Sequence, residues 1–447
     1  MSIELARLDA TQFRSLIAER EREGFTAPTL DDAGARRLAA VFGRPIGVHD
    51  AVRGIVADVR TRGDVAVREW TQRIDGVDVA EAHADCAAMA RAWDALEQPV
   101  RNALVAAANR IREFHLPQME TADRGFGSAW LRPVPLGRVG CYVPGGRAAY
   151  PSTVLMSVIP AQVAGVERIV VASPPGIDGG VHPLVAATAH LLGVTEVIAI
   201  GGAQAIAAMA HGTESIDRVD KIVGPGNAFV TLAKHEVFGS VGIDQLAGPS
   251  EILVIASAGA NPGLIAADLV SQLEHDPLAW AICVTDDAGL AGAVATDFAT
   301  AANDAARSEV IGIAAGRHAA VVVCESLRDG ITLAAGFAPE HLSLQGEASE
   351  ALRDEVRNAG AVFVGSLSPV SIGDYVAGPN HTLPTQGAAR YRGPLAVMDF
   401  LRWPSFVQLT DADFDTVAPV AIALAQAEGL QAHETALRAR TRMREPA

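Results

Sequence analysis

A Glu–His dipeptide, Glu340-His341, stands where a helix-like stretch gives way to a short strand-like run in GFAPEHLSLQG, residues 336–346. Glu and His are the side chains most often used for proton transfer near neutral pH. Pro339 biases residue 338 away from the helical region, so we expect a sharp entry into the strand. Adjacent strand residues point to opposite faces, but at a strand end both can reach one crevice. The dipeptide is compatible with a catalytic acid/base pair, and equally with two polar residues at the mouth of a loop.

Four further residues could bind a divalent metal ion. Gln272 and His275 lie three apart in DLVSQLEHDP, so a helix that ends near Pro277 would place both on one face. Asp374 and His381 add carboxylate and imidazole donors, and together the set would suit Zn²⁺ or a similar ion. The ordinary alternatives are a polar helix end near the negative pole of its dipole, and solvated loop residues.

Glu428 and His433 form another pair near the carboxyl end, in AQAEGLQAHETA. Five residues correspond to about 140° around a regular helix, so a single helix could not aim both side chains at one point. Gly429 could loosen the turn between them. Spacing alone therefore does not pair these residues.

The surrounding sequence divides into helical and strand-like zones. From about residue 8 to 130, apolar residues recur at helical spacing, as Val52, Ile55, Val56 and Val59 do. From about 133, short β-branched runs alternate with helix-like segments, which predicts βαβ units and a parallel sheet. A second such series begins near 248. The fold class is therefore α/β, with two lobes of parallel sheet covered by helices.

Two later segments differ from these lobes. Residues 366–394 are dense in Gly, Pro, Ser and Thr, and we expect a long loop there. Because it carries Asp374 and His381, we expect this loop to be functional. Residues 395–447 return to helical spacing.

Glycine-rich turns follow several of the predicted strands. YVPGG (142–146), GGAQ (201–204) and GPGN (224–227) all fall at carboxyl ends, which line the ligand crevice of an open parallel sheet. Glycines there let backbone N–H groups approach a phosphate. No clean G-x-G-x-x-G is present, and tight βα turns are an alternative explanation.

Composition and charge exclude several classes of protein. The net charge of −16 repels phosphate backbones and anionic lipid, so neither nucleic acid nor a membrane surface is an expected partner. The first residues show no secretory signal, and apolar stretches are too short to span a membrane. We therefore expect a cytoplasmic protein. Its four scattered cysteines fit reduced thiols, three of them in the core.

Longer motifs occur in order over roughly residues 30–440 and resemble those of histidinol dehydrogenases. They are YVPGGRAAYPSTVLM, GGAQAIAAMAHGTESI, VDKIVGPGNAFV, LAGPSEILVIA, QLEHDP, APEHL, GDYVAGPNHTLPT and AEGLQAH. The resemblance implies a zinc-dependent, NAD-linked homodimer. Such an enzyme oxidises L-histidinol through L-histidinaldehyde to L-histidine with two NAD⁺, in the last two steps of histidine biosynthesis.

The resemblance also implies a ligand set for zinc at Gln272, His275, Asp374 and His433. It implies that His433 comes from the tail of the partner subunit. The awkward spacing from Glu428 would then be resolved, because both residues would act across the dimer.

Substrate and cofactor contacts follow by motif position as well. The implied substrate contacts are Ser250, Gln272, His275, His341, Asp374, His381, Glu428 and His433. The implied NAD contacts are Tyr142, Gln204 and Asn227, which lie in the strand-end turns.

Oxidation of an alcohol to an acid requires two hydride transfers, and the aldehyde between them has no hydride to give until a nucleophile adds. We expect His341 to take the alcohol proton and Glu340 to activate water, which forms a gem-diol. Zinc bound to the substrate's amine and imidazole nitrogens would fix the reacting carbon against the nicotinamide. A thiol route would need an activated cysteine, and Cys141 is its candidate.

Two departures from the usual family motifs bear on the substrate. Leu273 replaces a common Ala in QLEHDP, and ARYRGPLAV follows the His381 loop where Phe-Ser-Ser is more frequent. A related zinc and NAD dehydrogenase for another small polar alcohol, such as a sulfonated diol, is therefore an alternative. A non-catalytic two-lobe binding protein and a zinc hydrolase that uses Glu340 are others. The intact AEGLQAH favours histidinol.

The predicted organisation has Rossmann-like lobes and four parts. Residues 1–30 form an N-terminal helical segment, and 31–132 with 247–390 form a first α/β lobe with the metal and catalytic residues. Residues 133–246 form a second, NAD-binding lobe, and 391–447 form a helical tail that reaches the partner's site.

Overall fold

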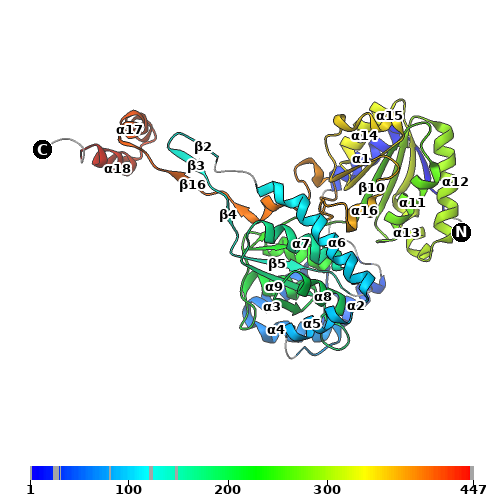
Figure 1. Cartoon of the computed structure of the whole chain (residues 1–447), viewed down its shortest axis with the longest axis horizontal. Coiled ribbons are helices and arrows are strands. Elements are labelled where there is room, and N and C mark those ends of the chain that lie inside the picture. Colours follow the sequence, from blue (N-terminus) through cyan, green and yellow to red (C-terminus); the bar gives the residue numbers. More distant parts are fainter. Residues whose placement is uncertain are drawn as a thin grey trace. The chain divides into compact units, whose positions relative to one another are not determined.

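The computed structural model describes residues 3–23, 30, 32–79, 82–119, 124–145 and 149–442, and Figure 1 shows the chain coloured along its sequence. The chain divides into two compact units. The first comprises Met1–Gln118 and Leu136–Phe400, and the second comprises Met119–Pro135 and Leu401–Ala447. Within the described ranges, no helix combines the length and the apolar character that crossing a bilayer would demand.

The larger sheet of the first unit has six strands in the order β1-β12-β11-β10-β13-β14, and all neighbouring pairs are parallel. The second predicted series of strands, from SEILVIAS to AVFVGS, is confirmed. The strands are β1 (Ala6–Asp9), β10 (Glu251–Ala256), β11 (Trp280–Thr285), β12 (Ala319–Val323), β13 (His341–Gln345) and β14 (Ala361–Val364).

Helices cover both faces of this sheet (Figure 1). On β10, Val254 packs with α11 to α13, whereas Leu253 packs with α1 and α14, as the two-residue period of a strand requires. Burial on both faces explains why these strands are almost wholly apolar. The helices are α1 (Ala10–Glu23), α11 (Pro262–Leu273), α12 (Ala288–Asp304), α13 (Ser308–His318), α14 (Leu327–Phe337), α15 (Glu347–Glu350) and α16 (Val370–Tyr375).

The smaller sheet has five parallel strands in the order β7-β6-β5-β8-β9. Its strands are β5 (Arg138–Tyr142), β6 (Arg168–Ser173), β7 (Glu196–Ala199), β8 (Lys221–Val223) and β9 (Gly242–Ile243). Its helices and those before it are α2 (Asp32–Phe42), α3 (Val48–Arg62), α4 (Asp64–Asp75), α5 (Cys86–Asp94), α6 (Gln98–His115), α7 (Pro151–Val163), α8 (Pro183–Leu191), α9 (Gly202–His211) and α10 (Ala228–Val237).

Two predicted assignments need correction. Residues 31–132 were expected in the lobe of 247–390, but α3 and α4 share a core with β6 to β8, α9 and α10, where Val52 and Ile55 are buried. Residues 1–30 were expected to be helical alone, but β1 pairs with β12 as an edge strand. Helical periodicity reports that a helix has an apolar face, and it does not identify the sheet that covers that face.

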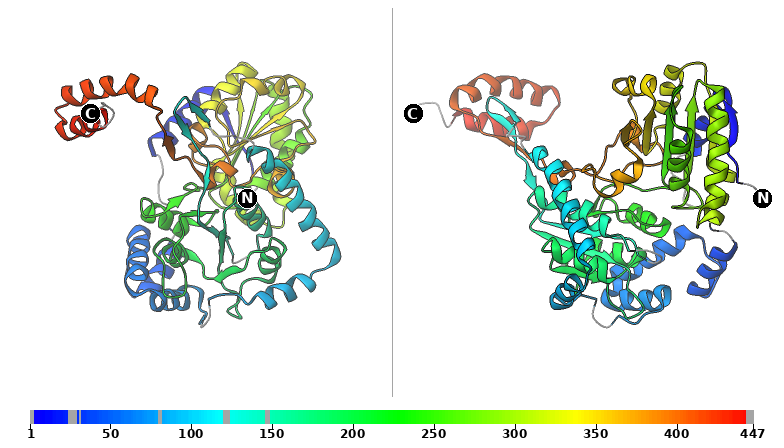
Figure 2. Two further views of the ribbon diagram at one scale, coloured as in Figure 1. Left: turned by 60° about the vertical axis from the view of Figure 1, so that its left-hand side comes forward. Right: turned by 45° about the vertical axis from the view of Figure 1, so that its right-hand side comes forward.

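The second unit joins the chain segment after α6 to the tail. β15 (Leu401–Arg402) pairs antiparallel with β4 (Val134–Pro135), and β16 (Ser405–Val407) pairs with β3 (Ala129–Leu131), which also pairs with β2 (Arg124–Phe126). Two helices follow, α17 (Asp411–Ala427) and α18 (Gln431–Arg442), and Figure 2 shows them as an adjacent pair at the red end of the chain. The tail is helical as predicted, but strands precede its helices and residues 391–400 belong to the first unit.

Candidate active site

A pocket of about 360 Å³ in the first unit gathers most of the predicted site residues. Part of its wall comes from the strand-end turns of the five-stranded sheet, through Pro144, Pro225 and Gly226. Further parts of the wall come from the start of α7, from the amino edge of the six-stranded sheet and from the segment after β14. Seven predicted residues line it: Ser250, Gln272, His275, Glu340, His341, Asp374 and His381.

Glu340 and His341 lie at the amino end of β13, and both reach this pocket. The preceding helix, α14, ends at Phe337, and Ala338 adopts a left-handed φ of 51°. The sharp entry into the strand is confirmed, although Ala338 is left-handed where an extended residue was expected. A non-glycine residue in this region is costly and is characteristic of functional sites. His341 Nδ1 lies 3.5 Å from Glu340 Oε2, and both side chains are almost completely buried.

The rings of His341 and His381 are held in the same way, so that each has Nε2 available in the pocket. Nδ1 of His341 donates to the backbone carbonyl of Glu251 at 3.0 Å, and Nδ1 of His381 donates to that of Asp374 at 2.9 Å. Each neutral ring therefore carries its lone pair on Nε2. Burial lowers the pKa of both rings to about 4, so both are uncharged at neutral pH. Among the described residues, Nε2 of His381 has no hydrogen-bond partner, so it can accept a ligand's proton or bind a cation.

Burial lowers the pKa of a histidine but raises the pKa of a carboxyl group, because it disfavours the charged form of each. It raises the pKa of Asp374 to about 6 and that of Glu340 well above its usual value, although a hydrogen bond from the Glu251 N–H opposes the latter shift. A carboxylate whose pKa is raised is a stronger base than a solvated one. Glu340 therefore has the chemistry expected of a group that activates water.

The pocket also contains donors suited to a metal ion. Gln272 is buried in the last turn of α11, His275 follows the end of that helix, and Asp374 lies on the short helix α16. Amide oxygen, imidazole and carboxylate suit a borderline divalent ion. Across the described ranges, no three His, Cys, Asp or Glu side chains gather closely enough to hold a metal. The chemistry of the donor set fits zinc, and a closed ligand shell would need one more donor.

Glu428 and His433 belong to the second unit. Glu428 caps α17, Gly429 has a left-handed φ of 72°, and α18 begins at Gln431, so the two side chains lie on different helices. Both are exposed. The helix is interrupted at Gly429, which the sequence had indicated as a residue that could loosen this turn.

The three predicted NAD residues lie at carboxyl ends of the five-stranded sheet. Tyr142 ends β5, and its hydroxyl accepts the Gly202 N–H at 3.1 Å. Gln204 is buried in the first turn of α9. Asn227 caps α10 by accepting the N–H groups of Phe229 and Val230, which is a structural role in its own right.

One glycine of these turns occupies a position that cannot accommodate a side chain. Gly224 follows β8 with a φ of +109°, and a Cβ there would lie 2.1 Å from the Tyr142 carbonyl oxygen. The GPGN turn is thus packed directly against the end of β5. Gly146 of YVPGG lies outside the described residues.

Sequence reasoning missed three charged residues near these sites. Glu251 is fully buried at the start of β10 and binds Arg20 of α1, and Asp75 at the end of α4 accepts from Gln204 Nε2 at 3.3 Å. A single acid directly before an apolar strand was a signal for Glu251, but its partners are distant in sequence. Asp75 gave no comparable signal.

The cysteines are free, and Cys141, Cys283 and Cys324 are buried as expected. Burial raises the pKa of the Cys141 thiol far above its usual range. A thiolate nucleophile at this position is therefore disfavoured.

Comparison with known proteins agrees with this picture. Residues 44–441 match the model of the family described as histidinol dehydrogenase. A protein from Parasynechococcus marenigrum (strain WH8102) named histidinol dehydrogenase is 49% identical over 88% of this chain and 91% of its own. One of the same name from Synechococcus sp. (strain ATCC 27144 / PCC 6301 / SAUG 1402/1) is 46% identical over 95% and 96%. The crystal structure of histidinol dehydrogenase from Elizabethkingia anophelis superposes with a TM-score of 0.88 at 31% identity, over 99% of both chains.

Fold, pocket and relatives first define the class, an α/β oxidoreductase. Within that class, the chain belongs to the histidinol dehydrogenase family. It is therefore an enzyme of histidine biosynthesis.

Proposed function

We propose that the protein oxidises L-histidinol to L-histidine through L-histidinaldehyde, with two NAD⁺ and one zinc ion. The observation that supports this most strongly is the single pocket that holds Ser250, Gln272, His275, Glu340, His341, Asp374 and His381. These residues come from four separate stretches of sequence, and a structural role alone would not require them to meet.

The two oxidations use the Glu–His pair in turn. His341 Nε2 takes the alcohol proton as the first hydride leaves for NAD⁺, and the aldehyde stays in the pocket. Glu340 then removes a proton from water as its oxygen adds to the carbonyl, and the carbonyl oxygen takes the proton that His341 holds. The gem-diol gives its hydride to the second NAD⁺ and a proton to the neutral His341 ring, and becomes the acid. The neutral His341 ring and the raised pKa of Glu340 support these assignments.

Zinc would be held by Gln272, His275 and Asp374 together with His433 of the partner subunit. When bound, it would polarise and orient the amino alcohol through its nitrogen atoms. The His381 Nδ1–H donates to the backbone carbonyl of Asp374, which would orient the His381 ring toward the substrate.

NAD⁺ would bind along the turns that contain Tyr142, Gln204 and Asn227. Two of these turns already contribute Pro144, Pro225 and Gly226 to the pocket, which would bring the nicotinamide to the catalytic pair. Backbone N–H groups in such turns suit a pyrophosphate.

A homodimer that shares its sites belongs to the same proposal, as does a cytoplasmic location. Apolar residues remain exposed along the second unit. Val417, Val420 and Leu424 of α17 follow helical spacing and are 44%, 61% and 59% exposed. A second copy of the chain would cover such a face, and Glu428 and His433 lie immediately beyond it.

The unusual ARYRGPLAV segment, which lies wholly within the described ranges, adds no residue to the lining of the pocket that holds the candidate substrate contacts. Its Arg390 binds the Glu21 side chain at 2.6 Å and the Gly336 carbonyl, and Arg390, Tyr391 and Arg392 line a different cavity. The segment also contacts the pocket wall indirectly, because the Leu395 N–H donates to the Thr382 carbonyl at 3.0 Å, next to His381.

The test is an NADH count with purified protein, L-histidinol, NAD⁺ and zinc. We expect two NADH per histidinol, and complete loss of turnover after removal of the metal by a chelator, with recovery on addition of zinc. One NADH per substrate, or activity that survives metal removal, would contradict the proposal.

A further inference from the structure

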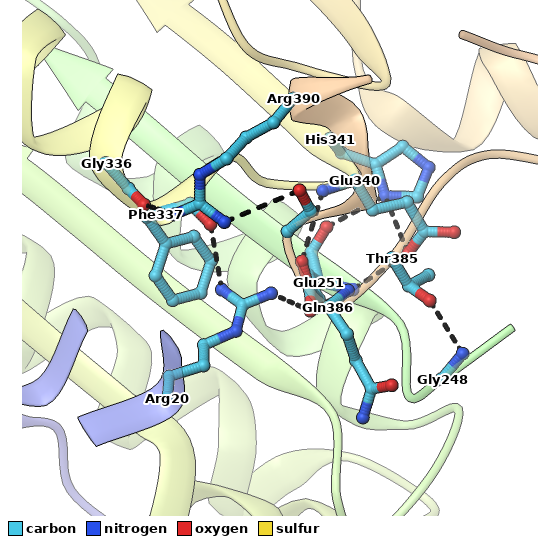
Figure 3. A network of polar contacts seen from close by, with 11 residues as sticks. Arg20, Gly248, Glu251, Gly336, Phe337, Glu340, His341, Thr385, Gln386 and Arg390 are labelled. Atoms are coloured by element: carbon cyan, nitrogen blue, oxygen red, sulfur yellow. Dashed lines mark hydrogen bonds and ion pairs between the residues drawn. The ribbon is translucent and has the colours of Figure 1, made fainter. Parts of the chain in front are cut away.

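The carboxylate of Glu251 is fully buried at the amino end of β10, directly after Ser250. Figure 3 shows that it is surrounded by groups from three other parts of the chain. Oε1 accepts from an Arg20 guanidinium N–H and from the Gln386 N–H at 2.9 Å. Oε2 accepts from the Glu340 N–H at 3.3 Å. Every partner is a donor, so the site suits a carboxylate with two accepting oxygens.

Glu251 and Glu340 hold one another by a reciprocal pair of hydrogen bonds. The Glu251 N–H donates to Glu340 Oε2 at 2.8 Å, while the Glu340 N–H donates to Glu251 Oε2. The contact to His341 is different in kind, because its Nδ1 donates to the backbone carbonyl of Glu251. The side chain of Glu251 therefore contacts the Glu340 backbone, whereas its own backbone contacts both the Glu340 carboxylate and His341.

Arg20 provides the positive charge that stabilises the buried carboxylate of Glu251. Its guanidinium donates to the Phe337 carbonyl at 3.1 Å and stacks over the Phe337 ring at 3.9 Å, and its side chain is 14% exposed. An unpaired buried carboxylate would be strongly unfavourable. Helix α1 is thus fixed to the end of α14, two residues before the Pro339-Glu340 entry into β13.

Two residues with unfavourable backbone conformations lie close to Glu251 and Glu340 in the chain or in contact with them. Among the described residues, the two non-glycine residues with positive φ are Ala338 and Gln386, at 51° and 53°. Gln386 donates directly to Glu251, and Ala338 lies two residues before Glu340. Such conformations persist where the surrounding contacts hold them, and Glu251 provides one of those contacts.

We propose that Glu251 is a positioning residue that fixes Glu340 for the attack of water on the aldehyde, with Arg20 of α1 as its counter-charge. This inference rests on the proposed function. Helix α1, in which the sequence indicated no functional residue, would then contribute to the second oxidation through Arg20.

The decisive variant is Glu251→Gln. Its amide can still accept from Arg20 and Gln386 through Oε1, but Nε2 then faces the Glu340 N–H, donor against donor. We expect oxidation of L-histidinaldehyde to fall by about 10- to 100-fold, because misplacement of a catalytic group has costs of that order. Oxidation of L-histidinol to the aldehyde should stay within about threefold, since the carbonyl that orients His341 is unchanged. The two rates are measured separately by single-turnover NADH formation from each substrate.

Variants of Arg20 provide a second, independent measurement if Glu251→Gln does not fold. Arg20→Gln should show the same selective loss, and Arg20→Lys should recover part of it by restoring the charge. Arg14→Gln is the matched control, because Arg14 lies on the same helix and pairs with Asp329 at the surface. It should leave both rates unchanged.

Equal loss of both half-reactions in Glu251→Gln and Arg20→Gln would overturn the positioning role, and so would full activity in both. Wild-type protein that forms no NADH from histidinol would instead contradict the proposed function. The two failures are therefore distinguishable.

Discussion

The two parallel sheets of the first unit contribute opposite edges to the pocket. The five-stranded sheet places its candidate residues at the carboxyl ends of strands, where open α/β sheets usually bind ligands. The six-stranded sheet places Ser250, Glu340 and His341 at or just before the amino ends of β10 and β13. The rule that ligands bind at the carboxyl ends of parallel strands therefore locates the candidate NAD residues. The same rule would misplace the catalytic pair, which lies at an amino end.

The amino edge also creates a different environment. Of the candidate NAD residues, Asn227 makes a local contact as the cap of α10, whereas Tyr142 and Gln204 contact Gly202 and Asp75, which lie 60 and 129 positions away. The catalytic pair is held by long-range contacts to Glu251, on a neighbouring strand, and through it to Arg20. We infer that local sequence builds the Asn227 cap, whereas the catalytic pair requires the tertiary fold.

The largest effect is expected for Glu340→Gln. Oxidation of the aldehyde should fall by about 10²- to 10⁴-fold, because the base that activates water is lost. Oxidation of histidinol and the zinc content should change little. NADH formation from histidinol and from histidinaldehyde, with metal analysis, checks this. Equal slowing of both steps would refute the division of roles between Glu340 and His341.

His433→Asn should weaken zinc binding and lower turnover by about 10- to 100-fold, since a donor to the metal site is lost. Mixing this variant with Glu340→Gln subunits tests where His433 acts. If the partner supplies it, half of randomly mixed dimers contain one intact site, and activity should recover to roughly a quarter of wild type. No recovery in mixed dimers would argue against a shared site.

In the cofactor lobe, Gly224→Ala should raise the KM for NAD⁺ and lower the free energy of unfolding by about 1–3 kcal/mol, because the residue has positive φ and its Cβ would collide with the Tyr142 carbonyl. Gly54→Ala in α3 is the matched control, since open space surrounds its Cβ. Thermal unfolding and KM measurements compare the two. A normal KM in a folded Gly224→Ala protein would contradict the role of this turn in NAD⁺ binding.

The smallest effect is expected at Asp75, whose pKa burial raises from 3.8 to about 6. Between these values the folded state binds more protons than the unfolded state, so this group lowers stability as pH rises through 4 to 6. Asp75→Asn should therefore increase the free energy of unfolding by about 1 kcal/mol at pH 8 and leave it unchanged near pH 4. Chemical denaturation at both pH values measures the difference, and a gain that is equal at both would exclude this origin.

The sequence by itself determined the α/β class, the strands from RVGCY to AVFV, and the chemical types of the site residues. These features are local, because strand and helix periodicity and turn chemistry are set by neighbouring residues. The position of α3 and α4 on the five-stranded sheet and the pairing of β1 with β12 were decided only in three dimensions. The tertiary structure also decided the contacts of Glu251 with Arg20, Glu340 and Gln386. These contacts join residues that lie 89 to 231 positions apart in the sequence. A buried carboxylate is stable only where distant donors surround it, and no local pattern encodes which donors those will be.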